Sequence, residues 1–324
     1  MDKIRVGVIG VGYFGQFHAE KYSGMEGVEL IGLVDVDPSR TQEVAQRFRT
    51  HPFSQTSDLY GRVEAVSVAV PTHLHHSIAR DFLLRGIDVL LEKPICTTVA
   101  EADELIQLAE AKNLIFQVGH LERFNGALSG VEGILQNPFL IESYRMGPYT
   151  GRGVDVDVVL DLMVHDIDIV LSLVPSTIKR LDAEGKSVLS SYNDIARAQI
   201  EFENGCRANL VSNRVSEEKV RKARILQPDG ILSLDYLHQT ASFSRKVGPP
   251  GSQRIPEGIT EEISTQKVDS LECEIHSFIG SVRDRKKARV SGRDGKRALE
   301  AALWILEKIN HPVQKRASIG RPNR

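Results

Sequence analysis

The sequence predicts two domains: a doubly wound α/β domain with a parallel sheet over residues 1–120, and an α+β domain with a mostly antiparallel open sheet over residues 121–324. The chain has 324 residues, more than one hydrophobic core usually supports. Up to about Gly119, short apolar runs alternate with amphipathic stretches. Beyond about Leu121, one long helical pattern is followed by hairpin signals.

Five β-branched apolar runs predict strands in the first domain: Ile4–Ile9, Glu29–Val34, Ala65–Val70, Asp88–Leu91 and Leu114–Val118. Apolar strands separated by helices are typical of a parallel sheet covered on both faces, because parallel pairing needs crossover connections. Asp37 and Pro38 are suited to begin the second helix, and Gly86 is suited to end the helix that follows Pro71.

In the second domain, the first predicted element is a long helix over Asp157–Leu173. Hairpin turns are expected at Glu203-Asn204-Gly205 and Pro228-Asp229-Gly230. Apolar periodicity predicts two further helices, over Leu271–Val282 and Arg297–Ile309. We expect a surface loop at residues 248–258 and a frayed basic tail at residues 315–324.

Composition narrows the class of protein. With 41 basic and 43 acidic side chains, the net charge is −2, so nothing favours nucleic acid or an anionic membrane. The three cysteines, Cys96, Cys206 and Cys273, lack disulfide or zinc spacing, which favours a reducing, cytoplasmic setting. The start of the chain lacks the pattern of a signal peptide, and acidic residues interrupt the apolar stretch Val154–Val174, so we expect no membrane span.

A glycine-rich turn follows the first predicted strand and precedes a helix. It reads Gly10-Val11-Gly12-Tyr13-Phe14-Gly15. In this context the glycines permit a tight turn, a close approach to a pyrophosphate and close helix packing, and the helix N-terminus offers N–H donors. The turn therefore predicts a Rossmann dinucleotide site, with a turn that binds nothing as the alternative.

Asp35 follows the second predicted strand, at the position where a carboxylate accepts hydrogen bonds from the adenosine ribose. Such a carboxylate repels a 2′-phosphate and favours NAD as the cofactor. Arg40 leaves NADP open, because an arginine nearby can pair with that phosphate.

Glu92-Lys93-Pro94 follows the fourth predicted strand, at the sheet edge where open α/β sheets bind ligands. Close to a nicotinamide and partly desolvated, Lys93 is suited to stabilise the alkoxide-like charge that develops during hydride transfer. An ordinary strand-end lysine is the alternative. Pro94 allows a cis Lys93-Pro94 bond.

The glycine-rich turn, Pro71 with His75, and Glu92-Lys93-Pro94 together resemble the glucose-fructose oxidoreductase/inositol dehydrogenase (Gfo/Idh/MocA) family. The resemblance implies that Lys93, Asp161 and His165 form the catalytic set. It also implies that Pro71, His75 and Glu92 line the cofactor side of an interdomain cleft.

In the second domain, Asp161-Leu162-Met163-Val164-His165 with Asp168 is similar to the family's D-x-G-x-H-x-x-D segment. Residues four apart on a helix share a face, so we expect Asp161 to orient His165, which removes the hydroxyl proton. Met163 stands where the family usually has glycine, which puts a simple polyol substrate in doubt.

Two alternatives remain for this helix. In the first, its polar residues form a solvent-exposed stripe along an otherwise apolar helix. A metal site would draw on the side chains of Asp155, Asp157, Asp161, His165 and Asp168. Because hydride transfer of this kind needs no metal, we expect none.

The segment His120-Leu121-Glu122-Arg123-Phe124-Asn125 resembles family members that act on nucleotide sugars, among them UDP-N-acetylglucosamine 3-dehydrogenases. We expect His120, Asn125 and Asp168 to face the substrate. Arg123 and Arg152 are suited to pair with a substrate diphosphate, and interdomain salt bridges are the alternative use for them.

The sequence thus predicts an NAD-dependent oxidoreductase that transfers a hydride between a nicotinamide and a secondary hydroxyl or keto carbon of a sugar or nucleotide sugar, with a UDP-N-acetylhexosamine 3-dehydrogenase-like activity favoured. Two alternatives stay open: an NADPH-dependent reductase of an oxo or imine group, and an NAD(P)(H)-binding sensor without turnover. The family resemblance also implies a homodimer or homotetramer.

Overall fold

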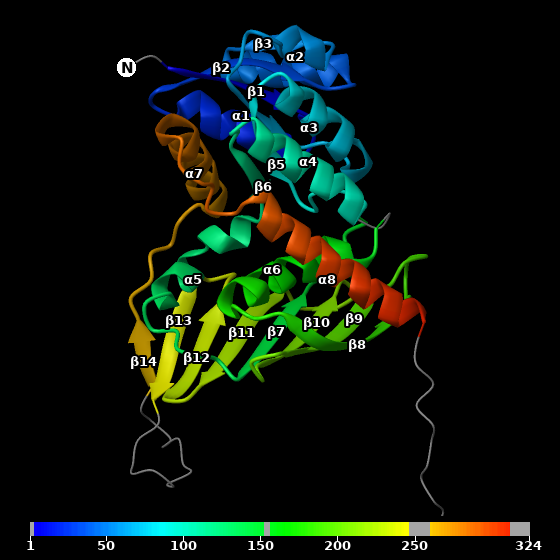
Figure 1. Cartoon of the computed structure of the whole chain (residues 1–324), viewed down its shortest axis with the longest axis vertical. Helices are drawn as coiled ribbons and strands as arrows, with labels where there is room; N and C mark the ends of the chain where they lie inside the picture. Colours follow the sequence, from blue (N-terminus) through cyan, green and yellow to red (C-terminus); the bar gives the residue numbers. More distant parts are fainter. Residues whose placement is uncertain (1–2, 152–155, 246–259, 312–324) are drawn as a thin grey trace, which may run out of the picture.

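The computed structural model describes residues 3–151, 156–245 and 260–311. Two sheets, each with its own helices, lie one above the other, and helices fill the space between them (Figure 1). The expected loop at 248–258, the tail at 315–324 and the predicted residues Arg152 and Asp155 lie outside the described ranges. Within those ranges, no helix combines the length and apolar character that a membrane span requires.

The first sheet is parallel and has the order β3-β2-β1-β4-β5-β6. Its strands are β1 (Ile4–Ile9), β2 (Val28–Val34), β3 (His51–Phe53), β4 (Ala65–Val68), β5 (Asp88–Glu92) and β6 (Phe116–Gly119). Its helices are α1 (Gly15–Gly24), α2 (Pro38–Phe48), α3 (His75–Leu84) and α4 (Val99–Ala111), with 3₁₀ turns η1 (Thr56–Leu59) and η2 (Thr72–Leu74). Side chains from α1 and α2 pack in one core cluster and those from α3 and α4 in another, which confirms the doubly wound arrangement.

Strand β3 is the one strand of this sheet that the sequence did not predict. It has only three residues, including Pro52, and it pairs at the sheet edge with β2. A proline is tolerated there because an edge strand lacks a second neighbour. Such a short run carries no periodic pattern, and Lys93 consequently follows the fifth strand rather than the fourth.

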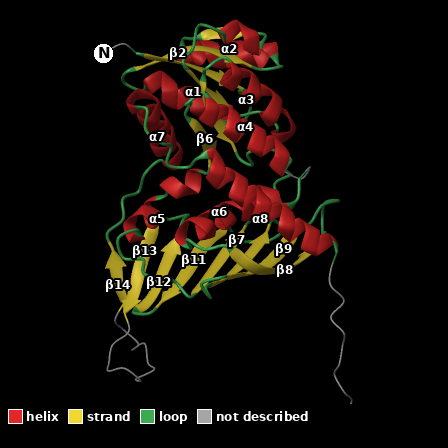
Figure 2. Cartoon of the chain, viewed as in Figure 1, coloured by secondary structure: helices red, strands yellow, loops and turns green. Residues whose placement is uncertain are grey.

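The second sheet has eight strands in the order β14-β13-β12-β11-β7-β10-β9-β8, antiparallel except between β7 and β10. Its strands are β7 (Leu140–Met146), β8 (Ile178–Lys186), β9 (Ile195–Phe202), β10 (Arg207–Asn213), β11 (Val220–Gln227), β12 (Gly230–Asp235), β13 (Thr240–Arg245) and β14 (Thr260–Ile263). Both predicted hairpins are confirmed, as β9–β10 and β11–β12. Helices cover one face of this sheet, and no helix of the described residues lies on the opposite face (Figure 2).

The covering helices are α5 (Gly126–Val131), which follows the 3₁₀ turn η3 (Leu121–Phe124), then α6 (Val164–Leu173) and α8 (Gly292–Asn310). The prediction of one regular helix over Asp157–Leu173 was wrong in its first turn. Residues Val159–Met163 form a π-helical turn, η4, before α6 begins. A π turn changes the angular spacing of side chains, which matters for Asp161.

The C-terminal helices return to the first sheet. Helix α7 (Ser270–Asp284) packs against α1, and its Ile275, Phe278 and Ile279 belong to the core cluster on that side of the first sheet. Helix α8 contacts both β6 and β8. The division at residue 120 remains a prediction, but α7 belongs by its contacts to the first sheet.

Candidate active site

The glycine-rich turn joins β1 to α1 and is shaped by close backbone contacts. Gly10 has φ +84°, and its N–H donates to the Val34 carbonyl over 2.7 Å. A Cβ on Gly15 would overlap the Gly10 carbonyl oxygen, whereas a Cβ on Gly12 would meet nothing within 4 Å. Gly12 is therefore not required by the packing of the protein itself, which fits a backbone left open for a pyrophosphate.

Asp35 lies at the end of β2, beside this turn. Its carboxylate accepts hydrogen bonds from the N–H of Val11 at 2.7 Å and of Asp37 at 3.0 Å. Arg40 lies 3.9 Å from Asp35 and 3.4 Å from Asp37. These carboxylates engage the arginine that would otherwise attract a 2′-phosphate, so the arrangement fits NAD.

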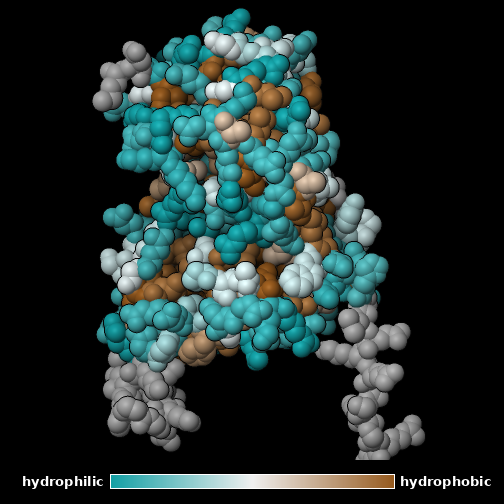
Figure 3. Space-filling model, viewed as in Figure 1, coloured by the Kyte–Doolittle hydropathy of each residue, from teal (hydrophilic) through white to brown (hydrophobic). Residues whose placement is uncertain are grey.

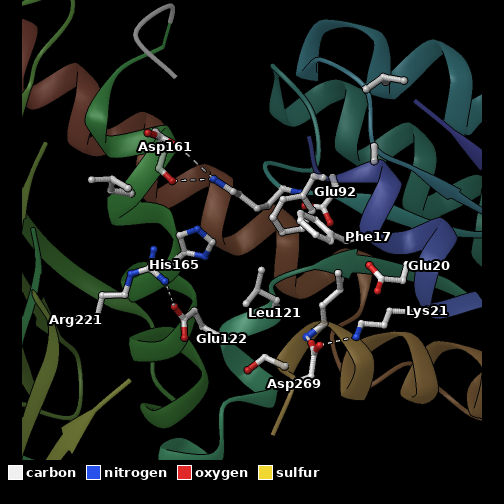
Figure 4. A pocket seen from close by; sticks show the side chains of 17 residues that line it. Phe17, Glu20, Lys21, Glu92, Leu121, Glu122, Asp161, His165, Arg221 and Asp269 are labelled. Atoms are coloured by element: carbon white, nitrogen blue, oxygen red, sulfur yellow. Dashed lines mark hydrogen bonds and ion pairs between the residues drawn. The ribbon is translucent and has the colours of Figure 1, made fainter. Parts of the chain in front are cut away.

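A cavity of about 840 Å³ lies between the two domains, next to the turn. Phe14 lines it, while Tyr13 beside it is 62% exposed. Figure 4 shows Asp161, His165 and Arg221 reaching this space from the second domain, and Glu92 from the first. The face drawn in Figure 3 is mostly hydrophilic, with scattered apolar patches. The interdomain cavity is the strongest candidate for a site because charged side chains from both domains line it beside the glycine-rich turn.

Lys93 extends from the end of β5 across the cavity to the π turn of the second domain. Its Nζ donates to the Asp161 carbonyl over 2.7 Å and lies 3.7 Å from Asp161 Oδ1. Burial lowers the pKa of Lys93, and the Asp161 and Glu92 carboxylates partly offset that effect. The Lys93-Pro94 bond is cis, as the sequence suggested.

His165 lines the same cavity from α6. Burial, reinforced by the positive charges of Lys93 and Arg145, holds its pKa well below the usual range, so the imidazole is neutral near pH 7. In the described residues its buried Nδ1 has no hydrogen-bond partner. The expected orientation of His165 by Asp161 is therefore corrected: because η4 is π-helical, Asp161 pairs with Lys93 instead.

Glu92 is held by a buried network that the sequence did not reveal. His18 on α1 lies 3.1 Å from Glu92 through Nε2 and 3.1 Å from the Ser67 hydroxyl through Nδ1, and Tyr22 lies 2.8 Å from the same hydroxyl. Glu92 in turn accepts from the Lys93 N–H at 3.2 Å. The i, i+4 spacing of His18 and Tyr22 was the available signal for this network.

The two other residues expected on the cofactor side differ in exposure. Pro71 is exposed just before η2. His75 is 1% exposed, and its two ring nitrogens lie 2.9 Å from the carbonyl oxygens of Pro94 and Val70. His75 thus positions the backbone after Lys93 rather than facing the cavity.

The residues predicted to contact substrate lie mostly behind the cavity wall. Arg123 is 3.3 Å from the buried Asp168, so it forms a salt bridge, but within the second domain rather than between the domains as the alternative expected. Asn125 caps α5 and is 4% exposed. His120 is 1% exposed, with both ring nitrogens unpartnered among the described residues. From the segment His120–Asn125, Leu121 and Glu122 are the described residues that line the cavity.

A buried ion cluster ties the elements around the site together. Arg145 on β7 donates to Glu122 on η3 and to Asp166 on α6, both over 2.8 Å. Arg221 on β11 lies 3.5 Å from the same Glu122 and lines the cavity. Arg221 was not predicted as a site residue, because its sequence signal is limited to an inward position on a strand far along the chain.

The described ranges contain no group of three His, Cys, Asp or Glu side chains arranged to hold a metal ion. Two of the proposed metal ligands have other partners. The Asp157 carboxylate accepts a hydrogen bond from the Asn193 side-chain amide at 2.6 Å, and the Asp168 carboxylate accepts one from Arg123 at 3.3 Å.

Comparison with known proteins decides the family. Residues 4–120 match the model of an oxidoreductase family with an NAD-binding Rossmann fold, Gfo/Idh/MocA, and residues 125–233 match a C-terminal domain model of the same family. The chain belongs to the Gfo/Idh/MocA family. It is accordingly an oxidoreductase, and its first domain binds NAD.

Among relatives in this family, UDP-N-acetylglucosamine 3-dehydrogenase of Acidithiobacillus ferrooxidans is 34% identical over 318 residues, covering 97% of this chain and 100% of that protein. Its crystal structure matches with a TM-score of 0.89 at 32% identity, covering 95% of this chain and 98% of that chain.

Scyllo-inositol dehydrogenase from Lactobacillus casei, solved with NAD(H) and scyllo-inositol, has a TM-score of 0.80 at 20% identity, covering 95% of this chain and 97% of that chain. This second similarity supports the fold of both domains.

Gly12 allows a direct test of where the cofactor binds. Because a Cβ at this position meets no protein atom, Gly12→Ala should leave the melting temperature within about 2 °C of the wild type. It should raise the Kd for NADH at least about tenfold, since the methyl group would project where the pyrophosphate approaches.

Fluorescence titration with NADH measures this effect. Gly24→Ala, on α1 and equally free of contacts, is the matched control and should bind normally. Unchanged NADH affinity in Gly12→Ala would contradict the placement of the cofactor on this turn.

The buried His120 makes the stability of the fold depend on pH. Burial lowers the pKa of His120, whereas a histidine in the unfolded chain protonates near pH ~6.5. Below that pH the unfolded chain binds one proton more than the folded chain, so the free energy of unfolding falls by up to about 1.4 kcal/mol per pH unit. His120→Gln should remove this contribution and flatten the decline between about pH 7 and about pH 5.5.

Urea unfolding at several pH values measures the slope. His51→Gln, at an exposed edge-strand histidine, should keep the wild-type slope. A slope that is identical in His120→Gln and the wild type would show that His120 is not held neutral.

Proposed function

We propose that this chain is an NAD-dependent dehydrogenase that oxidises a secondary hydroxyl of a nucleotide sugar, with C3 of a UDP-N-acetylhexosamine favoured. One observation carries the proposal: Lys93 from the first domain meets Asp161 and His165 of the second in one cavity beside the glycine-rich turn. The similarity to UDP-N-acetylglucosamine 3-dehydrogenase of Acidithiobacillus ferrooxidans supports the substrate class.

Lys93 has the position and the charge to assist the reaction. Bound NAD would supply the hydride acceptor. Lys93 at the cavity wall donates a hydrogen bond to the substrate oxygen and stabilises the negative charge that develops there as hydride leaves. Its contact with Asp161 holds the ammonium group at the domain junction.

His165 is suited to accept the proton of the hydroxyl group. Its low pKa keeps the imidazole unprotonated near pH 7, which leaves a lone pair for that proton. As the C–H hydride passes to the cofactor, the O–H bond breaks, the proton moves to His165 and the carbonyl forms. In reduction the imidazolium returns the proton.

We also propose that the protein works in the cytoplasm as a homodimer or homotetramer that does not bind nucleic acid. Free thiols at Cys96, Cys206 and Cys273 fit a reducing compartment. The helix-free face of the second sheet is the surface through which copies would associate.

The test is NADH formation by the purified protein with NAD or NADP, across UDP-N-acetylhexosamines, other UDP-sugars, free sugars and polyols. We expect turnover with NAD and a UDP-N-acetylhexosamine. When that sugar carries deuterium at C3, the label should appear in the reduced nicotinamide. Turnover confined to free polyols, or a label that stays in the sugar, would contradict the proposal.

A further inference from the structure

A second cavity of about 360 Å³ adjoins the active-site cavity. Asp161, Leu162 and Arg221 line both spaces, so the two cavities meet at these residues. Arg145, Arg214 and Lys219 also line the second space, which we call the basic side cavity. It opens beside the reacting groups and is rich in positive charge.

The arginines that line the side cavity differ in how closely carboxylates pair with them. Arg145 makes three hydrogen bonds with Asp166 and Glu122, and Arg214 bonds Asp194 at 2.8 Å. Among the residues that the structure describes, Arg221 has one carboxylate partner, Glu122 at 3.5 Å, which Arg145 already holds at 2.8 Å. Two guanidinium groups thus share one carboxylate oxygen.

Arg221 is also partly desolvated. Its side chain is 34% exposed, and burial, reinforced by the charge of Arg145, lowers its pKa. A guanidinium that is partly desolvated and lacks a carboxylate of its own gains from an incoming anion. Arg221 is therefore placed to bind an anionic part of the substrate at the junction of the two cavities.

We propose that Arg221, assisted by Lys219, binds the phosphate groups of the nucleotide-sugar substrate. The sugar then lies at Lys93 and His165, and the diphosphate continues into the basic side cavity. This inference rests on the proposed function. It assigns to Arg221 the phosphate contact that was expected of Arg123, because Arg123 is already paired with Asp168. A planar guanidinium suits phosphate oxygens because it donates two parallel hydrogen bonds.

The test compares Arg221→Gln with Arg224→Gln. Both arginines lie on β11, but Arg224 is 54% exposed and pairs with Glu142, away from both cavities. Arg221→Gln should raise the KM for the UDP-sugar and the Kd of UDP for the NADH-loaded protein about 10- to 100-fold, with kcat changed less. Arg224→Gln should leave both constants near those of the wild type.

Binding and turnover separate the two proposals. Loss of UDP affinity in Arg221→Gln supports the phosphate site even if no sugar nucleotide is turned over, in which case the proposed function alone fails. Normal KM and normal UDP affinity in Arg221→Gln overturn the phosphate site while the proposed function stands.

The source of the anion is resolved by further titrations with pyrophosphate and with glucuronate. Pyrophosphate binding that depends on Arg221, without binding of glucuronate, supports phosphate recognition. Arg221-dependent binding of glucuronate alone would overturn it in favour of a sugar carboxylate.

Discussion

The contact between Lys93 and Asp161 is the constraint on which the rest of the site depends. Lys93 ends a strand of the first sheet, and Asp161 lies in a π turn over the second, so their 2.7 Å hydrogen bond joins the two domains at the cavity. Glu92 and His75 fix the backbone on the first side of this contact. On the second side, His165 follows Asp161 by four residues and shares the cavity.

Burial then determines the chemistry of these groups. Removing Lys93 and His165 from water lowers the pKa of both, because the charged forms lose hydration. His165 is therefore a neutral base close to pH 7, while the carboxylates of Asp161 and Glu92 favour the charged form of Lys93. Oxidation of a hydroxyl group uses a base and a cation of this kind. Around them, Arg145 joins η3, β7 and α6 through buried carboxylates and holds the wall of the cavity.

Local sequence patterns were enough to predict five strands of the first sheet, two hairpins of the second sheet, the glycine-rich turn and the strand-end lysine, because each depends on residues that are close along the chain. Asp161 was placed in the correct segment but given the wrong partner, since nothing in the local pattern distinguishes a π turn from an α-helical turn. Arg221 and His18 were missed because their roles come from contacts with Glu122 and Glu92, about 100 and 74 positions away in sequence.

The measurement that tests this account most directly is single-turnover hydride transfer in Lys93→Met, with saturating NAD and UDP-N-acetylhexosamine. The account predicts a rate about 100- to 10,000-fold below the wild type, with NAD affinity retained because the glycine-rich turn is unchanged. Lys112→Met, at an exposed lysine after α4, should react normally. A rate in Lys93→Met within a few-fold of the wild type would contradict the central role of Lys93.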